Sequence, residues 1–318
     1  MLKMLPWAVR VMTLGAVLLG AVGCQSISAS ASVKTSPVTP MSAHASLRPK
    51  RHRRITPRSK SPHHPITFAS DALSLPEPSP SHPLKILVIG DSLGEDLQDG
   101  LIDIAGPSSA ITVIPAAVGS TGLANVAYYN WPKVLEQDLT RDHPQVVIIL
   151  IGGNDAVGFL QNGQPVEFGT ALWRADYGDR VASIIRESRQ AGADIVWVGL
   201  PLMAQGSVLP NSYMHELNAV YAAQVARNPG VATFIPTWSL FRTPNGQFAE
   251  YLTDSQGQSV MVRDPDGVHI APPAGQELIA AYVLSHLTHL AHISVCLNGS
   301  NLWAQYSFPH CRNSSQQG

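Results

Sequence analysis

The sequence predicts an α/β protein, a three-layer α/β/α sandwich around a five-stranded parallel sheet. Three observations lead to this class. The chain has 318 residues and 45% apolar side chains, enough to bury a large core. Five short runs are rich in Val and Ile, and helix-like stretches join each run to the next. Parallel strands need such crossovers, which cover both sheet faces with helices. We expect the flavodoxin-like strand order 2-1-3-4-5.

Each expected strand is a continuous apolar run, the pattern of a strand that is buried on both faces. In chain order, the expected strands are Lys85–Gly90, Ile111–Pro115, Gln145–Ile151, Asp194–Leu200 and Ala232–Pro236. The helix-like stretches are Asp96–Ile104, Pro132–Arg141, Tyr177–Ala191, Asn211–Arg227 and Pro273–His292. The last of them opens with prolines, which a first helical turn tolerates, and it is expected to cover one face of the sheet.

The N-terminus has the features of an export signal. Two basic residues, Lys3 and Arg10, lie at the start of the chain. Residues 11–23, which follow them, carry no charge and form a run too short to span a bilayer comfortably. The run ends in Ala-Val-Gly-Cys24, which resembles a bacterial lipobox with Ala in place of the usual Leu. We therefore expect residues 1–24 to be a signal peptide with lipid attached to Cys24. A cleaved signal without lipid and an uncleaved anchor are the alternatives. All three place the rest of the protein, residues 83–318, in the periplasm or cell envelope.

Charge is distributed unevenly along the chain. Residues 1–82 carry ten Lys and Arg against two acids, and residues 83–318 carry eleven against twenty. Residues 25–82 are rich in Ser, Pro and His, lack apolar runs and are expected to be a disordered basic linker. The basic centre at 48–54 suits anionic lipid head groups or cell-wall polymers, or is a solvated spacer. Residues 83–318 are acidic overall and have no cluster of basic residues, which argues against nucleic acid as a partner.

Two cysteines, Cys296 and Cys311, lie fifteen residues apart in the C-terminal tail, residues 294–318. In an oxidising compartment these two thiols can pair. A disulfide that closes a loop of this size contributes about 3 kcal/mol by the chain-entropy model, enough to fix a loose tail. Two unpaired thiols are the alternative. No cysteine and histidine spacing in the chain suggests a zinc site.

A serine follows the first expected strand, at the sheet edge where such folds place their sites. Gly90-Asp91-Ser92-Leu93 comes directly after the strand and opens a helix. At that turn the hydroxyl of Ser92 is exposed above the sheet, and its backbone N–H lies at the positive end of a helix. This suits a nucleophile whose intermediate is an oxyanion. Taken alone, the tetrapeptide is better explained by an N-cap serine.

Two further donors follow the neighbouring strands. Gly119 comes after the second strand and Asn154 after the third, in segments that would each, taken alone, be ordinary turns. In the expected strand order, the strand that carries Ser92 lies between these two. The backbone N–H of Ser92, that of Gly119 and the amide of Asn154 then converge on one point. A donor aimed at developing charge contributes about 3–4 kcal/mol of transition-state stabilisation.

A base is expected after the fifth strand, in the segment from Asp264 to His269. The Asp, Pro and Gly of this segment also fit a type I turn. The fifth strand is about 14 Å from the first at ~4.8 Å per strand, so the segment must cross the sheet edge, and residues 237–266 give it that reach. His269 can then accept the proton of Ser92 while Asp266 holds the other ring nitrogen. Asp254, near an expected hairpin turn, and Asp264 are rival partners.

These four blocks, in this order, resemble those of the SGNH (GDSL-type) hydrolase superfamily, and the resemblance spans residues 84–292. It implies the hydrolase fold for a domain at residues 83–293, and no metal or organic cofactor. Carried over by position, it implies a catalytic triad of Ser92, His269 and Asp266. It also implies an oxyanion hole made by Ser92, Gly119 and Asn154.

Other stretches are similar to a bacterial periplasmic branch of this superfamily whose function is largely unassigned. They are residues 130–132, Trp173, Tyr177, 197–201 and 262–263. That branch resembles partners of membrane acyltransferases that decorate polysaccharides. The resemblance therefore makes a membrane-bound acyltransferase a candidate partner of this protein and leaves open whether one works beside it.

The resemblance implies acyl transfer through a serine ester and leaves the acceptor open. With water, the protein is an esterase that removes O-acyl groups, first of all O-acetyl groups, from an envelope or exported polysaccharide or a small ester. With a sugar hydroxyl, it is an O-acyltransferase that uses the same triad. Two non-enzymatic roles also fit, a polysaccharide-binding module and an adaptor held by the basic linker. The joint presence of Ser92, Asn154, Asp266 and His269 argues against the binding module.

Two more patterns have simple explanations. Three histidines recur every three residues in the last helix: His286, His289 and His292. The local sequence supplies no facing carboxylates, so we expect no metal site there. The aromatic residues that are candidates for stacking on a sugar are Tyr128, Tyr129, Trp131, Trp173 and Tyr177. For each of them, packing in the core is the simpler explanation.

Overall fold

The computed structural model describes residues 73–105, 110–295 and 302–306. The signal peptide with Cys24, most of the linker, and both tail cysteines, Cys296 and Cys311, lie outside these residues. The predictions of lipidation and of a disulfide therefore stay predictions. Within the described part of the chain, no helix combines the length and the apolar character that crossing a bilayer requires.

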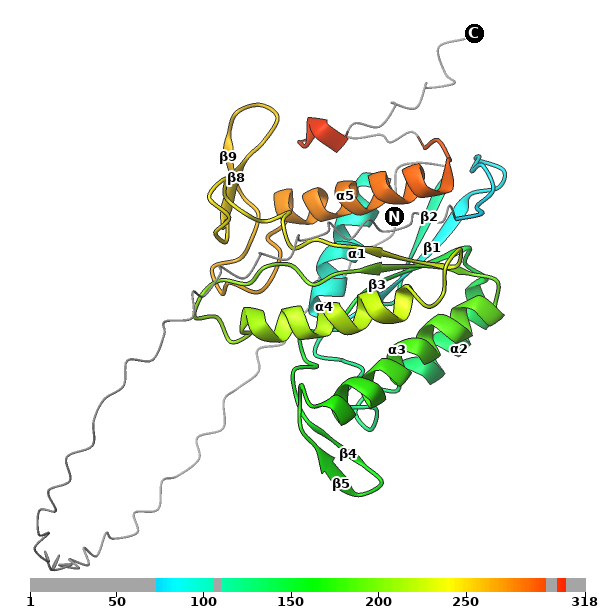
Figure 1. The fold of residues 1–318 in the computed structure, drawn as a ribbon. Helices are drawn as coiled ribbons and strands as arrows, with labels where there is room; N and C mark the ends of the chain where they lie inside the picture. The colour runs from blue at the N-terminus through cyan, green and yellow to red at the C-terminus, as the bar shows by residue number, and fades with distance from the viewer. Residues whose placement is uncertain (1–72, 106–109, 296–301, 307–318) are drawn as a thin grey trace, which may run out of the picture. The chain divides into compact units, whose positions relative to one another are not determined.

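The sheet has the predicted strands in the predicted order, and Figure 1 labels β2, β1 and β3 side by side within it. From one edge to the other, its strands are β2 (Ile111–Pro115), β1 (Leu84–Gly90), β3 (Val146–Leu150), β6 (Asp194–Val198) and β7 (Ala232–Ile235). Each neighbouring pair is parallel. Every residue of β3 is buried, and so is every residue of β1 except Lys85. The apolar runs of β1 and β3 thus belong to strands that are covered on both faces, whereas the edge strands β2 and β7 are only partly buried.

Helices cover both faces of this sheet. On one face, α1 (Ser92–Ala105) packs against α5 (Ala274–Ala291). On the other, α2 (Trp131–Asp142) packs against α3 (Ala171–Gln190), and α3 against α4 (Asn211–Val225). Figure 1 shows the two groups of helices on opposite sides of the strands. The predicted three-layer α/β/α sandwich is confirmed.

The largest boundary difference is at α3, which begins at Ala171 rather than at Tyr177. The side chain of Thr170 caps this helix, because its Oγ1 accepts a hydrogen bond from the backbone N–H of Trp173 (3.1 Å). The added turn is held by packing, since the rings of Trp173 and Tyr177 are both buried and stack with their centroids 4.5 Å apart. Trp131 is buried as well, so these three aromatic residues belong to the core.

Two short hairpins interrupt the connections between strands and helices. The first consists of β4 (Phe159–Gln161) and β5 (Gln164–Val166), and the second of β8 (Tyr251–Thr253) and β9 (Ser259–Met261). The second contains the turn expected near Gly257. The first was not predicted, although Asn162 and Gly163 both have positive φ and form the Asn-Gly pair that favours a tight hairpin.

Packed structure extends beyond residues 83–293 at both ends of the domain. Leu73 is buried, and its backbone N–H donates to the carbonyl of Leu290 in α5 (3.2 Å). Near the other end, Trp303 is buried and its Nε1 donates to the carbonyl of Ala274 (3.0 Å), just before the 3-10 turn η1 (Ala304–Tyr306). Both flanking segments therefore lie against α5.

The contact between α1 and α5 depends on a residue without a side chain. A Cβ placed on Gly100 would lie 2.1 Å from the carbonyl oxygen of Gln276 and 3.1 Å from the Cβ of Ala280. The first of these atoms is backbone and cannot rotate away. The two helices thus approach each other as closely as the backbone allows at Gly100.

We expect Gly100→Ala to lower the free energy of unfolding. Alanine gains up to about 1 kcal/mol over glycine in helix propensity. Overpacking a tight contact costs about 1–3 kcal/mol, so the clash with Gln276 outweighs that gain. Denaturant unfolding followed by circular dichroism measures the difference. Asp99→Ala, at an exposed position of the same helix, is the matched control. Equal or greater stability of Gly100→Ala would contradict the packing described here.

Candidate active site

Ser92 occupies the turn between β1 and α1. Gly90, which ends β1, is indispensable to this turn, because a Cβ there would lie 2.0 Å from the carbonyl oxygen of Leu150 in β3. The chain can therefore leave the sheet at this point only with a glycine. Ser92 then begins the helix, half-buried, with its backbone N–H at the positive end of α1.

The buried side chain of Asp91 fixes the turn from below. Its Oδ1 accepts from the backbone N–H of Leu93 (3.0 Å), and its Oδ2 accepts from those of Gly152 (2.9 Å) and Gly153 (2.7 Å). Burial raises the pKa of Asp91 to about 7, although these three donors favour the ionised form. The nucleophile turn is thus tied directly to the loop that carries Asn154.

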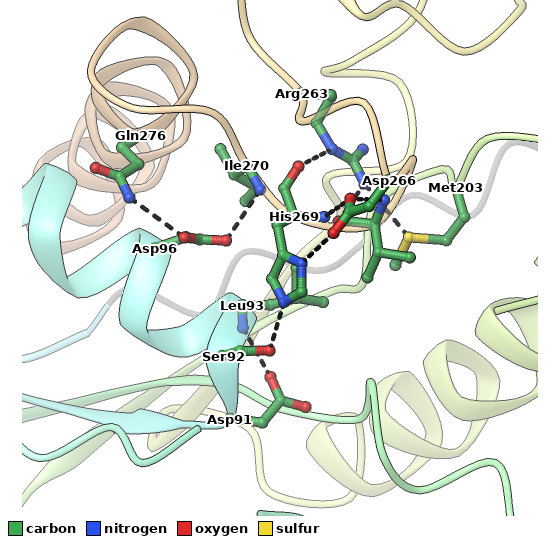
Figure 2. Close-up of polar contacts among 11 residues, drawn as sticks. Asp91, Ser92, Leu93, Asp96, Met203, Arg263, Asp266, His269, Ile270 and Gln276 are labelled. Atoms are coloured by element: carbon green, nitrogen blue, oxygen red, sulfur yellow. Dashed lines mark hydrogen bonds and ion pairs between the residues drawn. The ribbon is translucent and has the colours of Figure 1, made fainter. Parts of the chain in front are cut away.

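His269 links Ser92 to Asp266 (Figure 2). The Nε2 of His269 lies 2.9 Å from the Oγ of Ser92, and its Nδ1 lies 2.6 Å from the Oδ2 of Asp266. A carboxylate can only accept, so Nδ1 carries a proton and donates it, which leaves Nε2 to accept from the hydroxyl of Ser92. The structure thus brings together the three residues predicted for the triad, in the order that a nucleophile, base and orienting acid require.

The Asp266 segment is held in shape by its own side chain. Asp266 Oδ1 accepts from the backbone N–H groups of Val268 (2.8 Å) and His269 (3.0 Å), while Oδ2 binds the imidazole. Gly267, with a φ of +74°, closes the predicted turn by donating its N–H to the carbonyl of Asp264 (2.9 Å). The turn residues of this segment therefore serve to aim His269.

Asp266 and His269 shift each other's pKa in opposite directions. Burial disfavours the ionised form of Asp266, but the bond from His269 and the two backbone donors outweigh it and lower its pKa to about 2. Burial also disfavours protonated His269, but the Asp266 carboxylate outweighs it and raises the histidine pKa above its ordinary value of 6.5. At neutral pH the pair therefore holds an ionised carboxylate beside a strengthened base.

A buried arginine braces the same segment. Arg263 donates from Nη1 to the carbonyl of Leu202 (2.7 Å), from Nη2 to that of Val268 (2.6 Å) and from Nε to that of His269 (3.2 Å). Its guanidinium carbon lies 5.0 Å from the centroid of the Phe241 ring. Burial lowers the pKa of Arg263 to about 10, so it remains charged at neutral pH. Arg263 thus joins the loop of His269 to the loop of Leu202, which follows β6.

Asp96 joins the base to the helix of the nucleophile. It lies one helical turn after Ser92, and its Oδ2 accepts from the backbone N–H of Ile270 (2.9 Å) while its Oδ1 accepts from Nε2 of Gln276 (3.2 Å) (Figure 2). Burial raises the pKa of Asp96 to about 6. The carboxylate also contributes to the raised pKa of His269. Sequence reasoning missed Asp96, although its spacing of four residues from Ser92 puts it on the same helix face.

The two other predicted oxyanion-hole donors lie in the loops on either side of β1, as the strand order requires. Asn154 is exposed, and one N–H of its side-chain amide donates to the carbonyl of Thr121 (2.9 Å). The backbone N–H of Gly119 donates to Oε1 of Glu95 (2.8 Å). Glu95 was not predicted as a site residue. The oxyanion roles of Ser92, Gly119 and Asn154 stay predictions.

Asp155 ties these two loops together beneath the site. Its buried carboxylate accepts from the backbone N–H groups of Leu123 (3.0 Å) and Ala124 (2.7 Å), and from the hydroxyl of Tyr177 (2.6 Å). Burial raises the pKa of Asp155, and these three donors oppose the shift. The loop after β2 is therefore fixed to the loop after β3.

The rival residues lie in other contacts. Asp254 accepts from the backbone N–H groups of Gln256 and Gln258 (2.8 Å each) in the turn of the second hairpin. Asp264 contributes its backbone N–H to the carbonyl of His269 (3.0 Å), while Asp266 is the carboxylate at the imidazole. Among the residues that the structure describes, no three His, Cys, Asp or Glu side chains gather as a metal site would need.

The strand order and the hydrogen-bonded chain of Ser92, His269 and Asp266 are those that the sequence motifs predicted. The chain belongs to a family of proteins of unknown function, DUF459, whose model matches residues 85–286, more than half of the sequence. Among curated proteins, none matches this sequence.

Similar solved structures are distant in sequence. TesA is 23% identical (TM-score 0.42), with 65% of this chain and 99% of that chain covered. The psychrotrophic esterase EstA from Pseudoalteromonas sp. is 15% identical (TM-score 0.43), with 66% and 99% covered. A catalytic mutant of Axe2, an acetylxylan esterase from Geobacillus stearothermophilus, is 16% identical (TM-score 0.45), with 64% and 93% covered.

The raised pKa of His269 makes a prediction about pH. If neutral His269 is the base, kcat/KM for an activated ester falls as the pH drops, with a midpoint above 6.5. Asp266→Asn removes the carboxylate that raises this pKa, so the pKa of His269 falls and the rate drops by about 10⁴-fold. A pH–rate profile of the native chain and an NMR titration of the His269 ring in both proteins measure the two effects. A rate that is constant from about pH 4 to 8 would rule out His269 as the base.

The contacts of Asp96 make a second prediction. Asp96→Ala releases Ile270 and Gln276, and we expect kcat to fall on the order of 10- to 100-fold with a smaller change in KM, because the base loses its alignment. Asp96→Asn retains an oxygen for Ile270 but not the charge, so more of kcat remains and the acid limb of the pH–rate profile moves to lower pH. Steady-state kinetics across pH make the comparison, with Asp103→Asn, exposed on the same helix, as control. If the acid limb of the pH–rate profile is the same in Asp96→Asn as in the native chain, Asp96 has a structural role only and does not raise the pKa of His269.

Proposed function

We propose that the protein is a serine esterase of the SGNH type that removes O-acyl groups, chiefly O-acetyl groups, from an envelope or exported polysaccharide. The observation that carries this proposal is the hydrogen-bonded chain from Ser92 through His269 to Asp266. The export signal and the lipobox at Cys24 support a location in the periplasm or cell envelope, with the domain held to a membrane by lipid.

The first half of the reaction forms a serine ester. Ser92 Oγ attacks the carbonyl carbon of the substrate as its proton passes to Nε2 of His269, and the carbonyl oxygen becomes an oxyanion. Asp266 stabilises the imidazolium that results. The bond from carbon to the sugar oxygen then breaks, and His269 returns the proton to that oxygen. The products are a sugar hydroxyl and an acyl group on Ser92.

The second half of the reaction removes the acyl group. Water gives a proton to His269 and attacks the ester carbon, and a second oxyanion forms. When the bond to Ser92 Oγ breaks, the proton returns to that oxygen and a carboxylic acid leaves. A sugar hydroxyl in the place of water would instead give a new sugar ester and an O-acyltransferase, for which a membrane-bound acyltransferase is a suitable partner.

The charges around the nucleophile favour a neutral substrate. Asp96, Asp264 and Asp266 all act electrostatically on the imidazole of His269. Arg263 interacts electrostatically with the same three aspartates, and it is fully buried and donates to backbone carbonyls. An anionic group beside Ser92 would be repelled by the carboxylates and would not reach this guanidinium. An acetylated neutral sugar fits these conditions.

The test follows the acetyl group from donor to product. The purified full-length chain and its Ser92→Ala variant are incubated with an activated acetyl ester and acetylated glycans, and mass spectrometry locates the acetyl group. We expect release of free acetate that falls at least about 10³-fold in Ser92→Ala, with a transient acetyl adduct on Ser92.

Two further results would point to a different function. Acetyl transferred to an added sugar would favour the O-acyltransferase. Equal inactivity of both proteins, with both bound to the glycan, would overturn the esterase and favour a polysaccharide-binding module.

A further inference from the structure

The carboxylate of Glu95 occupies a donor that the predicted oxyanion hole needs. Glu95 lies on α1, three residues after Ser92, and its Oε1 accepts from the backbone N–H of Gly119 at 2.8 Å. A Cβ on Gly119 would lie 2.8 Å from Oε2, the second carboxylate oxygen. The side chain of Glu95 is half-buried, and it lies directly over this glycine.

This contact opposes the chemistry of a simple ester. An N–H bonded to a carboxylate is engaged with a stronger acceptor than an ester carbonyl. When the carbonyl oxygen becomes an oxyanion, a carboxylate at the same donor repels it, because two negative charges would then lie within a few ångströms of each other. For Gly119 to stabilise the oxyanion, the Glu95 carboxylate has to leave it.

The side chain of Glu95 must do this alone, because the backbone around it is fixed. Gly94 packs so closely that a Cβ there would lie 2.7 Å from the carbonyl oxygen of Leu150, and Leu93 and Leu97 are buried. The loop of Gly119 is also held independently, since the N–H of Ala117 donates to Oε1 of Gln98 (3.0 Å). Rotation of Glu95 therefore frees the donor without moving either the helix or the loop.

We propose that Glu95 is a specificity-determining residue that selects esters with a free hydroxyl next to the acyl group. Such a hydroxyl offers the carboxylate a replacement donor, so that Glu95 turns to the substrate and releases the N–H of Gly119 to the oxyanion. An ester without a neighbouring donor leaves the carboxylate on Gly119. The proposal rests on the proposed function and names its substrate class: a partly acylated polyol or sugar, in which a hydroxyl adjoins the ester.

The test compares substrates with and without that hydroxyl. The full-length chain, Glu95→Ala and Glu95→Gln are assayed on a methyl glycoside monoacetate with free neighbouring hydroxyls, on the same compound with those hydroxyls O-methylated, and on p-nitrophenyl acetate. We expect the native chain to prefer the free-hydroxyl compound over its methylated form by about 10-fold or more in kcat/KM, the scale of one hydrogen bond to a charged group.

The two variants separate the charge of Glu95 from its position. In Glu95→Ala the preference disappears, because kcat for p-nitrophenyl acetate and the methylated compound rises. Glu95→Gln keeps an oxygen for Gly119 without the negative charge, so its preference is intermediate. Asp99→Ala, which removes an exposed carboxylate one turn further along α1, should match the native chain. Thermal unfolding of each variant shows whether it is folded.

Other results overturn the proposal. If folded Glu95→Ala keeps the native preference, or loses activity on all three substrates in parallel, Glu95 does not determine specificity, while Ser92-dependent turnover leaves the proposed function standing. If Ser92→Ala equals the native chain on every substrate, the proposed function is wrong, and this inference falls with it.

Discussion

The site depends on the carboxylate of Asp91, which is buried beneath the nucleophile turn. It accepts three backbone N–H groups, one from the turn itself and two from the loop after β3. A buried carboxylate is stable only when its lone pairs have donors, so the two segments cannot separate without leaving a charge unpaired in the core. Ser92 and Asn154 are thus carried by one unit. The adjacent carboxylate of Asp155 does the same for the loop after β2.

The base is held by a different principle. His269 lies in the loop between β9 and α5, and its position comes from polar contacts of side chains with the backbone groups of that loop. Asp266 binds the segment from within, Arg263 from the side of Leu202, and Asp96 from the nucleophile helix. Side chains thus perform the role that regular secondary structure performs for Ser92. The imidazole is in this way both oriented and made more basic by carboxylates.

The sequence was informative where a residue's role depends on near neighbours in the chain. The five strands are visible as apolar runs, and Ser92, Asp266 and His269 lie in short motifs at strand ends or turns. The extra turn of α3 and the hairpin at Asn162 had local signals, a capping Thr170 and an Asn-Gly pair, which the apolar pattern overshadowed. Glu95 had no such signal and Asp96 had only its spacing of four residues from Ser92, because their partners, Gly119 and Ile270, are distant in sequence. In the sequence, a helix carboxylate whose partner is distant along the chain cannot be told apart from a carboxylate that faces solvent.

The close backbone contact between α1 and α5 at Gly100 makes the two helices one tightly packed unit. This unit carries the nucleophile at one end and, through Gln276 and Asp96, the base segment beside it. The segment with Trp303 lies against the first turn of the same α5. The far C-terminal part of the described chain therefore packs on the same helix whose first turn, through Gln276, contacts Asp96 beside the base segment.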